Sequence, residues 1–565
     1  MKRAPPVLLL ALVLAGALAA RIACQEPAIA RSDDAYRMRL VELTLASRRA
    51  PAHDRFLAHP GGLDVPWPPL YHAALAFAAR RVLPASSEDL ALGGIDEQAL
   101  ERLAARSTPA LGLLAVLVVF ATVLRLAGSS GAAPAASVPR SRAALGAILA
   151  AAFYALLPGV VEREALGRVD HHALAAVLAL AQLGLVARAL HARERSDATL
   201  ASLLGGLAGG LAMLAAPESI LTVAACAGVL LVQAVRRSGL ASRDAWRGAV
   251  LYGAAAASLY TIAWPGSLRT GLLPDLAEPS VLHGFGRSWT ALVLLPAAWL
   301  ALWPSRRAPT RALVLSLGAL ALAGSLVDAR FEGQLHVALA CTLGLVFADR
   351  ARTFAASPRR YAWALLVTAA PAFAGWIERG SLSGSAARIA GLRWMREGTP
   401  SPAPFNSAAA IPDWGVLSAP DWGGSIAYHA RRPVSAASFA GLGGDGRSEA
   451  AARALLFADP QGLLRSMREL DAAYVVVGPE LLRELPSLVR QAGYAPGSIT
   501  GEAVEGTVLW HLAIGGGGAD AVPGLERVFA SQELASSGRA GAAGPVVSIW
   551  RRLADVPGAP ALQAR

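Results

Sequence analysis

The sequence predicts a polytopic α-helical membrane protein with a separate C-terminal domain that mixes helices and strands. Composition is the first observation: 55% of the 565 residues are hydrophobic and only 16% are charged, whereas about a quarter of the residues in soluble domains are charged. The second is the number of apolar segments. About eleven of them, with their flanking residues, approach the roughly 20 residues that a membrane-spanning helix needs.

The predicted spans follow one another along most of the first two thirds of the chain. The first covers residues 5–20 after a basic start, and is either a cleaved signal peptide or an uncleaved anchor, of which we favour the anchor. The others cover residues 108–126, 143–158, 173–190, 199–215, 219–235, 248–264, 288–303, 310–326, 333–348 and 360–377.

The connections between these spans alternate in charge. Arginines gather in every second connection, and the positive-inside rule makes these five connections cytoplasmic. The other connections, among them the long loop 21–107 and the segment 265–287, are then extracytoplasmic. The sequence therefore predicts a transmembrane domain over residues 1–377 in the cell membrane and an extracytoplasmic domain over residues 378–565.

The C-terminal part carries the patterns of a small mixed α/β domain. Residues 448–470 are predicted to be helical, and the apolar runs 471–477, 508–514 and 546–550 are predicted to be strands. Glycine-rich segments separate these elements.

The formal charge of +12 is carried almost entirely by arginine, with Lys2 as the only lysine. The arginines flank apolar segments instead of forming one basic face with interleaved aromatic residues. They therefore indicate membrane topology and exclude a nucleic-acid partner. The three cysteines show no CxxC or CxxH spacing, so neither a structural zinc site nor a disulfide framework is indicated.

Acids and histidines stand close to the ends of predicted spans, where charge is costly. Asp34 follows the first span, and Asp170 and His172 directly precede the fourth, with His171 as their neighbour. Ionisable side chains near membrane depth need a partner or a metal. Carboxylate oxygens with an imidazole nitrogen suit Mg²⁺ or Mn²⁺. These residues are candidate ligands of a catalytic metal; the alternative is ordinary loop acids and a histidine at a helix start.

The predicted external segments carry further short motifs. In chain order the motifs are Asp33-Asp34-Ala35-Tyr36, Val65-Pro66-Trp67-Pro68-Pro69-Leu70, Arg163-x₃-Gly167-x₂-Asp170-His171-His172, Leu276-Ala277-Glu278-Pro279, Ala329-Arg330-Phe331 and Ala419-Pro420-Asp421-Trp422-Gly423. In this order they resemble the motifs of the catalytic subunit of oligosaccharyltransferases, in the archaeal and bacterial single-subunit form.

The resemblance implies a GT-C fold and a defined reaction. Such enzymes move a glycan from a polyprenyl or dolichyl pyrophosphate carrier to the asparagine of an Asn-x-Ser/Thr sequon. The resemblance implies that Asp34, Asp170 and His172 hold the metal, with Asp34 also orienting the acceptor amide. It further implies that Glu278 completes the site from a mobile loop and that Arg330 meets the pyrophosphate.

The acceptor side departs from the family pattern. The signature Trp-Trp-Asp-Tyr-Gly is replaced here by residues 419–423, so that both tryptophans that help to seat the sequon hydroxyl are lost. Asp421, Trp422 and Trp414 remain as candidate acceptor contacts, although the two tryptophans can equally be core residues of the external domain. Donor-side chemistry is therefore expected to be retained and sequon recognition to be weakened.

Three functions remain open on the sequence. The first is metal-dependent transfer of a polyprenyl-linked glycan to a protein. The second is a GT-C transferase with a hydroxyl, lipid or cell-wall glycan as acceptor, and the third is a non-catalytic, carrier-binding membrane protein. Four charged candidates, Asp34, Asp170, Glu278 and Arg330, argue against the third, because a scaffold has no use for costly charges at the membrane.

Overall fold

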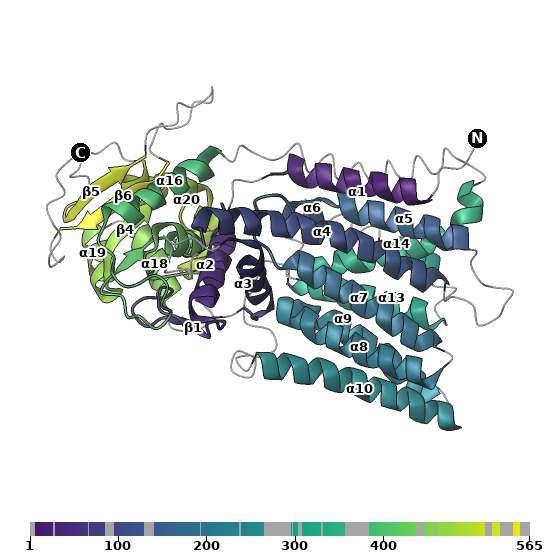
Figure 1. The fold of residues 1–565 in the computed structure, drawn as a ribbon. Helices are drawn as coiled ribbons and strands as arrows, with labels where there is room; N and C mark the ends of the chain where they lie inside the picture. The colour runs from purple at the N-terminus through teal and green to yellow at the C-terminus, as the bar shows by residue number, and fades with distance from the viewer. Residues whose placement is uncertain are drawn as a thin grey trace.

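Long, roughly parallel helices form one part of the molecule, and a mixed sheet with short helices forms the other part at one end of the bundle (Figure 1). We call this second part the external part, or external domain, after its predicted side of the membrane. The structure is a computed structural model, and it describes residues 6–553 apart from 26–28, 66, 85–94, 129–139, 193, 237–238, 265–294, 297, 303–307, 329–330, 356–382, 438–445, 458, 496, 515–521 and 532–545.

Nine long helices of the described chain lie side by side in the bundle. They are α1 (Pro6–Ala23), α4 (Glu97–Gly128), α5 (Arg140–Leu156), α7 (His172–His191), α8 (Arg195–Ala215), α9 (Ile220–Arg236), α10 (Gly239–Ala263), α13 (Pro309–Val327) and α14 (Glu332–Ala355). By length and hydropathy, α1, α4, α7, α8, α9 and α13 can each cross a membrane, and α5 is a shorter apolar helix. The chain is a multi-pass membrane protein.

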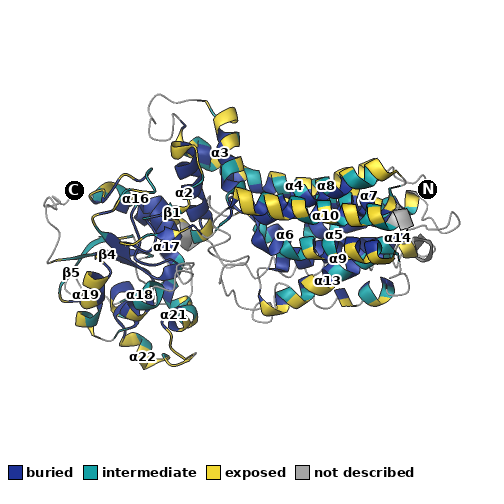
Figure 2. Ribbon diagram, turned by 90° about the horizontal axis from the view of Figure 1, so that it is seen from below, coloured by how far each residue is buried: buried dark blue, intermediate teal, exposed yellow. Residues whose placement is uncertain are grey.

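These nine helices coincide with nine of the predicted spans. The span predicted at 288–303 lies partly, and the span at 360–377 wholly, outside the described residues, as does the predicted domain boundary at 377/378. Exposed residues occur along the helices of the bundle (Figure 2). The exposed large apolar residues of these helices include Leu114, Val250 and Val327. A broad apolar surface of this kind fits contact with lipid.

Glycines allow two pairs of helices in the bundle to approach closely. A Cβ atom on Gly146 of α5 would lie 2.5 Å from the carbonyl oxygen of Gly344 on α14, and one on Gly206 of α8 would meet the backbone of Tyr252 on α10. In a membrane, helices associate through such close packing because lipid tails are as apolar as the side chains.

The loop after α1 folds into a short connecting unit between the two parts. It contains α2 (Ser32–Ser47), the hairpin of β1 (His53–Asp54) and β2 (Leu63–Asp64), and α3 (Leu70–Val82). On α2, Tyr36 and Leu40 belong to the core of the external part, whereas Met38 and Val41 pack with α3 and the start of α4. Helix α2 is therefore buried on opposite faces, and its polar residues Asp34, Arg39 and Glu42 lie in a protein interior.

The external part is built on a four-stranded mixed sheet in the order β3-β4-β6-β5, with β3 parallel to β4 and the other pairs antiparallel. This confirms the predicted mixed α/β class. Its elements are α16 (Ser383–Gly398), β3 (Gly415–Leu417), η6 (Pro420–Trp422), α17 (Gly423–Ser425), the π-helical η7 (Ile426–Ala430), α18 (Arg447–Leu456), α19 (Pro460–Glu469), β4 (Ala472–Val477), α20 (Glu480–Arg483), α21 (Leu485–Gln491), α22 (Glu502–Glu505), α23 (Val508–Ala513), β5 (Leu525–Ala530) and β6 (Ser548–Arg552).

One element predicted from the sequence in this part is wrong. The run 508–514, predicted as a strand, forms helix α23, because the Thr507 side chain caps the helix by accepting a hydrogen bond from the Trp510 backbone N–H at 3.3 Å. The predicted strands at 471–477 and 546–550 are confirmed as β4 and β6, the latter shifted by about two residues, a usual uncertainty in element ends. The predicted helix 448–470 is divided before Pro460 into α18 and α19.

Candidate functional site

The predicted donor-side residues meet at the end of the bundle that faces the external part. Asp34 lies in the first turn of α2, and Asp170 lies in the loop 164–171 just before α7. The three-residue helix η3 (Pro217–Ser219), between α8 and α9, lies against the same loop through Glu218. Three segments that are far apart in the sequence therefore converge.

Backbone contacts fix the loop 164–171. Gly167, at a φ of 99°, donates a hydrogen bond to the Ala105 carbonyl of α4 at 3.3 Å and accepts one from the Ile29 N–H at 3.1 Å. The Asp170 N–H donates to the Thr108 hydroxyl at 3.2 Å. A positive φ favours glycine, so the motif glycine serves the turn that directs Asp170 toward α2.

The beginning of this loop is held by a buried ion pair with α1. The Arg21 guanidinium donates through Nε to Glu164 at 3.1 Å, and the two side chains are 0% and 3% exposed. The Arg21 carbonyl also accepts the Leu166 N–H at 3.1 Å, and the Tyr154 hydroxyl donates to Glu164 at 3.2 Å. Helix α1 is therefore part of the framework of the site.

Arg168 joins the two predicted carboxylate ligands. Its Nε lies 2.7 Å from Asp34 Oδ2 and its Nη2 lies 3.5 Å from Asp170 Oδ2. Asp34 is 1% exposed. Burial raises the pKa of the Asp34 carboxyl, and the charge of Arg168 opposes that rise. Asp34 Oδ2 is thus in an ion pair with Arg168, whereas Oδ1 has no hydrogen bond in the described part of the chain and keeps coordination capacity.

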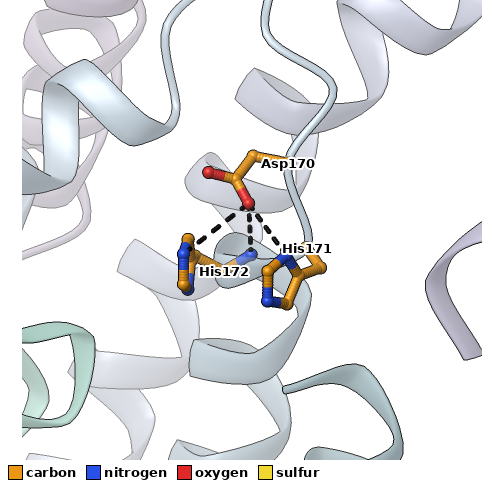
Figure 3. Close-up of side chains that lie close together, drawn as sticks. All are labelled: Asp170, His171 and His172. Carbon is orange, nitrogen blue, oxygen red and sulfur yellow. Dashed lines mark hydrogen bonds and ion pairs between the residues drawn. The ribbon is translucent and has the colours of Figure 1, made fainter. Parts of the chain in front are cut away.

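Asp170, His171 and His172 form the tightest group of potential metal ligands. One carboxylate oxygen of Asp170 faces both imidazole rings (Figure 3), at 3.0 Å from His171 Nδ1 and 3.9 Å from His172 Nε2. One ligand atom from each residue lies within 4.8 Å of the others. The His172 N–H also donates to Asp170 Oδ1 at 3.2 Å, which fixes the carboxylate at the start of α7.

The protonation states of Asp170 and His171 suit metal binding. Burial alone would raise the pKa of Asp170, but the charges of His172 and Arg37 outweigh burial and hold it well below its usual range. Burial and Arg37 lower the pKa of His171 to about 4. At neutral pH Asp170 is therefore ionised and His171 is neutral, which are the forms in which these side chains bind metals.

Sequence reasoning missed Glu218, and it gave His171 only as a neighbour of the predicted ligands. The sequence places Glu218 only in a turn, yet its Oε1 lies 3.3 Å from His172 Nδ1 and 3.9 Å from His171 Nε2, and the residue is 6% exposed. The available signal was a single acid inside a three-residue connection between two apolar spans. His171, predicted as a neighbour only, lies as close to Asp170 as a ligand needs.

The structure places Asp170 and His172 in one group of possible ligand atoms, whereas Asp34 lies outside that group and is linked to Asp170 through Arg168. Glu278 and Arg330 lie outside the described residues, so their roles remain predictions. The carboxylate and imidazole donors at Asp170, His171 and His172 fit a divalent ion of the first transition row.

The predicted acceptor residues lie on the external side of the same junction. A Cβ atom on Gly424 would meet the backbone of Ser32, and the Ser425 N–H donates to the Ser32 hydroxyl at 3.3 Å. This contact places the segment containing Asp421 beside the start of α2. Asp421 accepts a hydrogen bond from Gln491 Nε2 at 3.0 Å. Burial raises the pKa of Asp421, and the charge of Asp33 adds to the rise.

The two predicted acceptor tryptophans pack within the external part. Trp422 is 2% exposed and belongs to its core, and the Arg388 guanidinium lies 5.1 Å from its ring centre. Trp414 lies 4.9 Å from the ring of Tyr474 on β4. Both indoles support the backbone on either side of Asp421, and an acceptor role for them stays a prediction.

The molecule is a multi-pass helical bundle that is joined through the loop after α1 to an α/β domain, with carboxylates and histidines at the junction. This is the architecture of the GT-C class of membrane proteins. The chain is similar to the archaeal oligosaccharyltransferase AglB from Archaeoglobus fulgidus, solved in complex with an inhibitory peptide and a dolichol-phosphate. The TM-score is 0.69 at 15% identity, over 97% of this chain and 88% of that one.

A second structure of the Archaeoglobus fulgidus enzyme, a complex with Zn and sulfate, matches at a TM-score of 0.67 and 15% identity, over 96% of this chain and 88% of that one. In sequence, the chain is 30% identical over 149 residues to dolichyl-phosphooligosaccharide-protein glycotransferase 1 of the same organism. That alignment spans 26% of this chain and 20% of the relative. No family model matches the chain. The predicted resemblance to oligosaccharyltransferases and the GT-C fold are confirmed.

Proposed function

We propose that this protein is an oligosaccharyltransferase-type enzyme that transfers a glycan from a polyprenyl-(pyro)phosphate carrier to the asparagine of a protein. The observation that carries the proposal is the convergence of Asp34, Asp170 and His172 at the junction of bundle and external domain. Two segments that are far apart in the sequence supply these residues, in a fold shared with an archaeal oligosaccharyltransferase.

We propose that a divalent ion, Mg²⁺ or Mn²⁺, is held by Asp34, Asp170 and His172, with His171 close enough to contribute. When bound, such an ion supplies Lewis-acid stabilisation of charge on the departing pyrophosphate. One structural relative was solved as a complex with Zn and sulfate, which supports metal binding in this fold. Two imidazoles beside one carboxylate favour Mn²⁺ over the harder Mg²⁺.

The protein's own charges have complementary roles in this proposal. Arg168 and Arg37 neutralise the carboxylates in the absence of substrate and orient them. Glu278, on its loop, would complete the site around bound substrate, and Arg330 would stabilise the pyrophosphate. Asp421 would contact the acceptor, with Trp414 and Trp422 beside it.

The proposed site faces the extracytoplasmic side, together with residues 378–565. The five arginine-rich connections support this orientation, because the site lies at the opposite ends of the helices. Reporter fusions at Gly441 and at Ser305 are expected to report opposite sides of the membrane. The same side for both would contradict the topology.

The activity is tested with purified protein, a polyprenyl-pyrophosphate glycan and an asparagine-containing peptide. We expect carrier consumption and peptide glycosylation that stop in excess EDTA and return on addition of Mn²⁺ or Mg²⁺. Full activity in EDTA would overturn the metal dependence. Consumption of the carrier without peptide glycosylation would favour the second candidate, transfer to a hydroxyl, lipid or cell-wall glycan. The hydrogen bond that Gln491 donates to Asp421 supports that alternative, because it already occupies one oxygen of the carboxylate proposed to contact the peptide.

A further inference from the structure

A cavity of about 330 Å³ lies at the junction, and its lining includes none of Asp170, His171 and His172. Its volume is at the lower end of the roughly 300–1,000 Å³ typical of ligand pockets. The first turns of α4 form one wall, and Gln25 after α1, the loop residues Leu166 and Gly167, and Arg393 of α16 form the others. The cavity therefore contacts the bundle, the site loop and the external domain together.

Three arginines give the cavity its chemistry. Arg102 and Arg106 lie one turn apart on α4, and Arg393 faces them from α16. Gln25 and Gln98 add amide donors. Donors with a net positive charge in this arrangement fit a group with several acceptor oxygens and negative charge, which is the chemistry of a phosphate.

The acids near the cavity only partly satisfy this charge. Glu101 lies 3.4 Å from Arg393 and accepts a hydrogen bond from the Tyr428 hydroxyl at 3.1 Å. Asp96 lies 3.6 Å from Arg102, and both side chains are more than half exposed. In the part of the chain that the structure describes, Arg106 has no carboxylate within 4.0 Å. The cavity therefore keeps positive charge that is available to a ligand.

The position of the cavity favours a lipid as the source of the phosphate. Below Arg106, the same outward row of α4 continues with Leu114 and Leu117, which are 43% and 38% exposed. On the adjoining α1, Leu18 and Ile22 are 41% and 48% exposed. Arginines at the outer end of an apolar helix face lie at the level of lipid headgroups.

We propose that the cavity lined by Arg102, Arg106 and Arg393 binds the headgroup phosphate of an anionic phospholipid, whose acyl chains lie along the exposed faces of α1 and α4. This site is separate from the donor site, and it does not depend on the proposed activity. A lipid bound there contacts Leu166 and Gly167 of the loop that presents Asp170, and it contacts α16 of the external domain, so it would also brace the two parts of the protein.

The test uses the full-length protein in a neutral detergent and three probes: short-chain phosphatidylglycerol, short-chain phosphatidylcholine and inorganic phosphate. Binding is measured by titration, together with the shift in the unfolding temperature. We expect phosphatidylglycerol to bind at least about tenfold more tightly than phosphatidylcholine, in a manner that weakens with salt because the contacts are partly exposed.

The double variant Arg102→Gln with Arg106→Gln is expected to bind phosphatidylglycerol at least about tenfold more weakly, as loss of two charge-assisted contacts requires. The matched control, Arg465→Gln with Arg468→Gln on α19, removes two exposed arginines of the external domain and should bind like the unaltered protein. Arg393→Gln, on a different element, gives an independent reading if the double variant does not fold.

Equal binding of phosphatidylglycerol by the unaltered protein and both cavity variants would overturn the site. If inorganic phosphate binds as tightly as phosphatidylglycerol, and this binding depends on the arginines, the ligand is a free phosphate and the proposal of a lipid headgroup is wrong. Equal affinity for phosphatidylcholine would overturn the selection for an anionic headgroup.

Discussion

The donor side and the acceptor side of the junction treat their carboxylates differently. On the donor side, Asp170 lies among cationic and imidazole groups that hold its pKa well below its usual range. On the acceptor side, Asp421 is hydrogen-bonded to the neutral amide of Gln491, and burial raises its pKa. The surroundings of Asp170 therefore stabilise the ionised carboxylate, as the proposed metal site requires, whereas those of Asp421 disfavour it and favour the protonated form.

The largest effect is expected from the donor carboxylates. Asp170→Asn or Asp34→Asn should lower turnover of the carrier-linked glycan by about 10²–10³-fold or more, the range for losing one electrostatic contact to a transition state. Glycan transfer is measured together with the unfolding temperature, which should fall because each amide leaves the buried guanidinium of Arg168 without an ionised partner, so activities are compared at a temperature at which every variant is folded.

Asp421→Asn is the matched control for this comparison. It should reduce turnover far less than Asp170→Asn, because Asp421 does not contact the metal group. If the three variants lose activity equally, the distinction between the two sides is wrong.

A smaller effect is expected at Glu218, which contacts the imidazoles and not the proposed substrate. Partners of metal-ligating histidines typically contribute 10–100-fold to metal affinity or activity. Glu218→Gln should therefore raise the Mn²⁺ concentration needed for half-maximal activity by about that factor while leaving activity at saturating Mn²⁺ nearly intact. An unchanged metal requirement would exclude Glu218 from the site.

Helix α2 offers a comparison of two buried acids two turns apart. Asp34 faces the proposed donor site. Glu42 is 0% exposed, and its carboxylate has no hydrogen bond in the described part of the chain. It lies near Arg431 and Glu97, where the two parts of the protein meet. Burial raises the pKa of Glu42 from 4.5 to about 8. The folded state therefore keeps a proton that the unfolded state releases between these values.

Glu42 therefore makes the free energy of unfolding fall as pH rises from about 4.5 to about 8. The decrease is at most roughly 1.4 kcal/mol per pH unit, and Glu42 causes no further change above that range. Glu42→Gln should flatten this part of the stability profile and leave glycan transfer unchanged at neutral pH. Chemical unfolding of the protein at several pH values, alongside the activity assay, measures both. If the stability of the Glu42→Gln variant still falls over this pH range, the pH dependence comes from another titratable group.

The apolar segments were enough to predict the bundle, and shorter apolar runs were enough to predict the strands β4 and β6. The motifs singled out Asp34 and Asp170, whose roles in the site remain predictions. Periodicity could not predict α23, because its apolar run is compatible with both a strand and a helix and the Thr507 cap decides between them. Glu218 could not be assigned because its role depends on η3 lying beside α7. That contact is set by packing between helices that are distant in the sequence.

The smallest expected effect concerns acceptor choice. A site that seats a hydroxyl against a buried acid and packed indoles rejects an acceptor without the hydroxyl, because its polar groups are then left unpaired. In this protein Asp421 already accepts a hydrogen bond from Gln491, and Trp422 is buried in the core of the external domain. We therefore expect less than about tenfold discrimination, or roughly 1.4 kcal/mol, between Asn-x-Thr and Asn-x-Ala peptides.

Competition between the two peptides for one carrier-linked glycan measures this ratio directly. Replacing Gln491 with Leu separates two explanations of a low ratio. If Gln491 occupies the carboxylate in place of the acceptor hydroxyl, the variant frees Asp421 and the preference for the Thr peptide should rise. If the missing indoles alone are responsible, the ratio should stay unchanged. A strong preference in the unaltered protein would contradict both and would show that Asp421 exchanges Gln491 for the acceptor hydroxyl when the peptide binds.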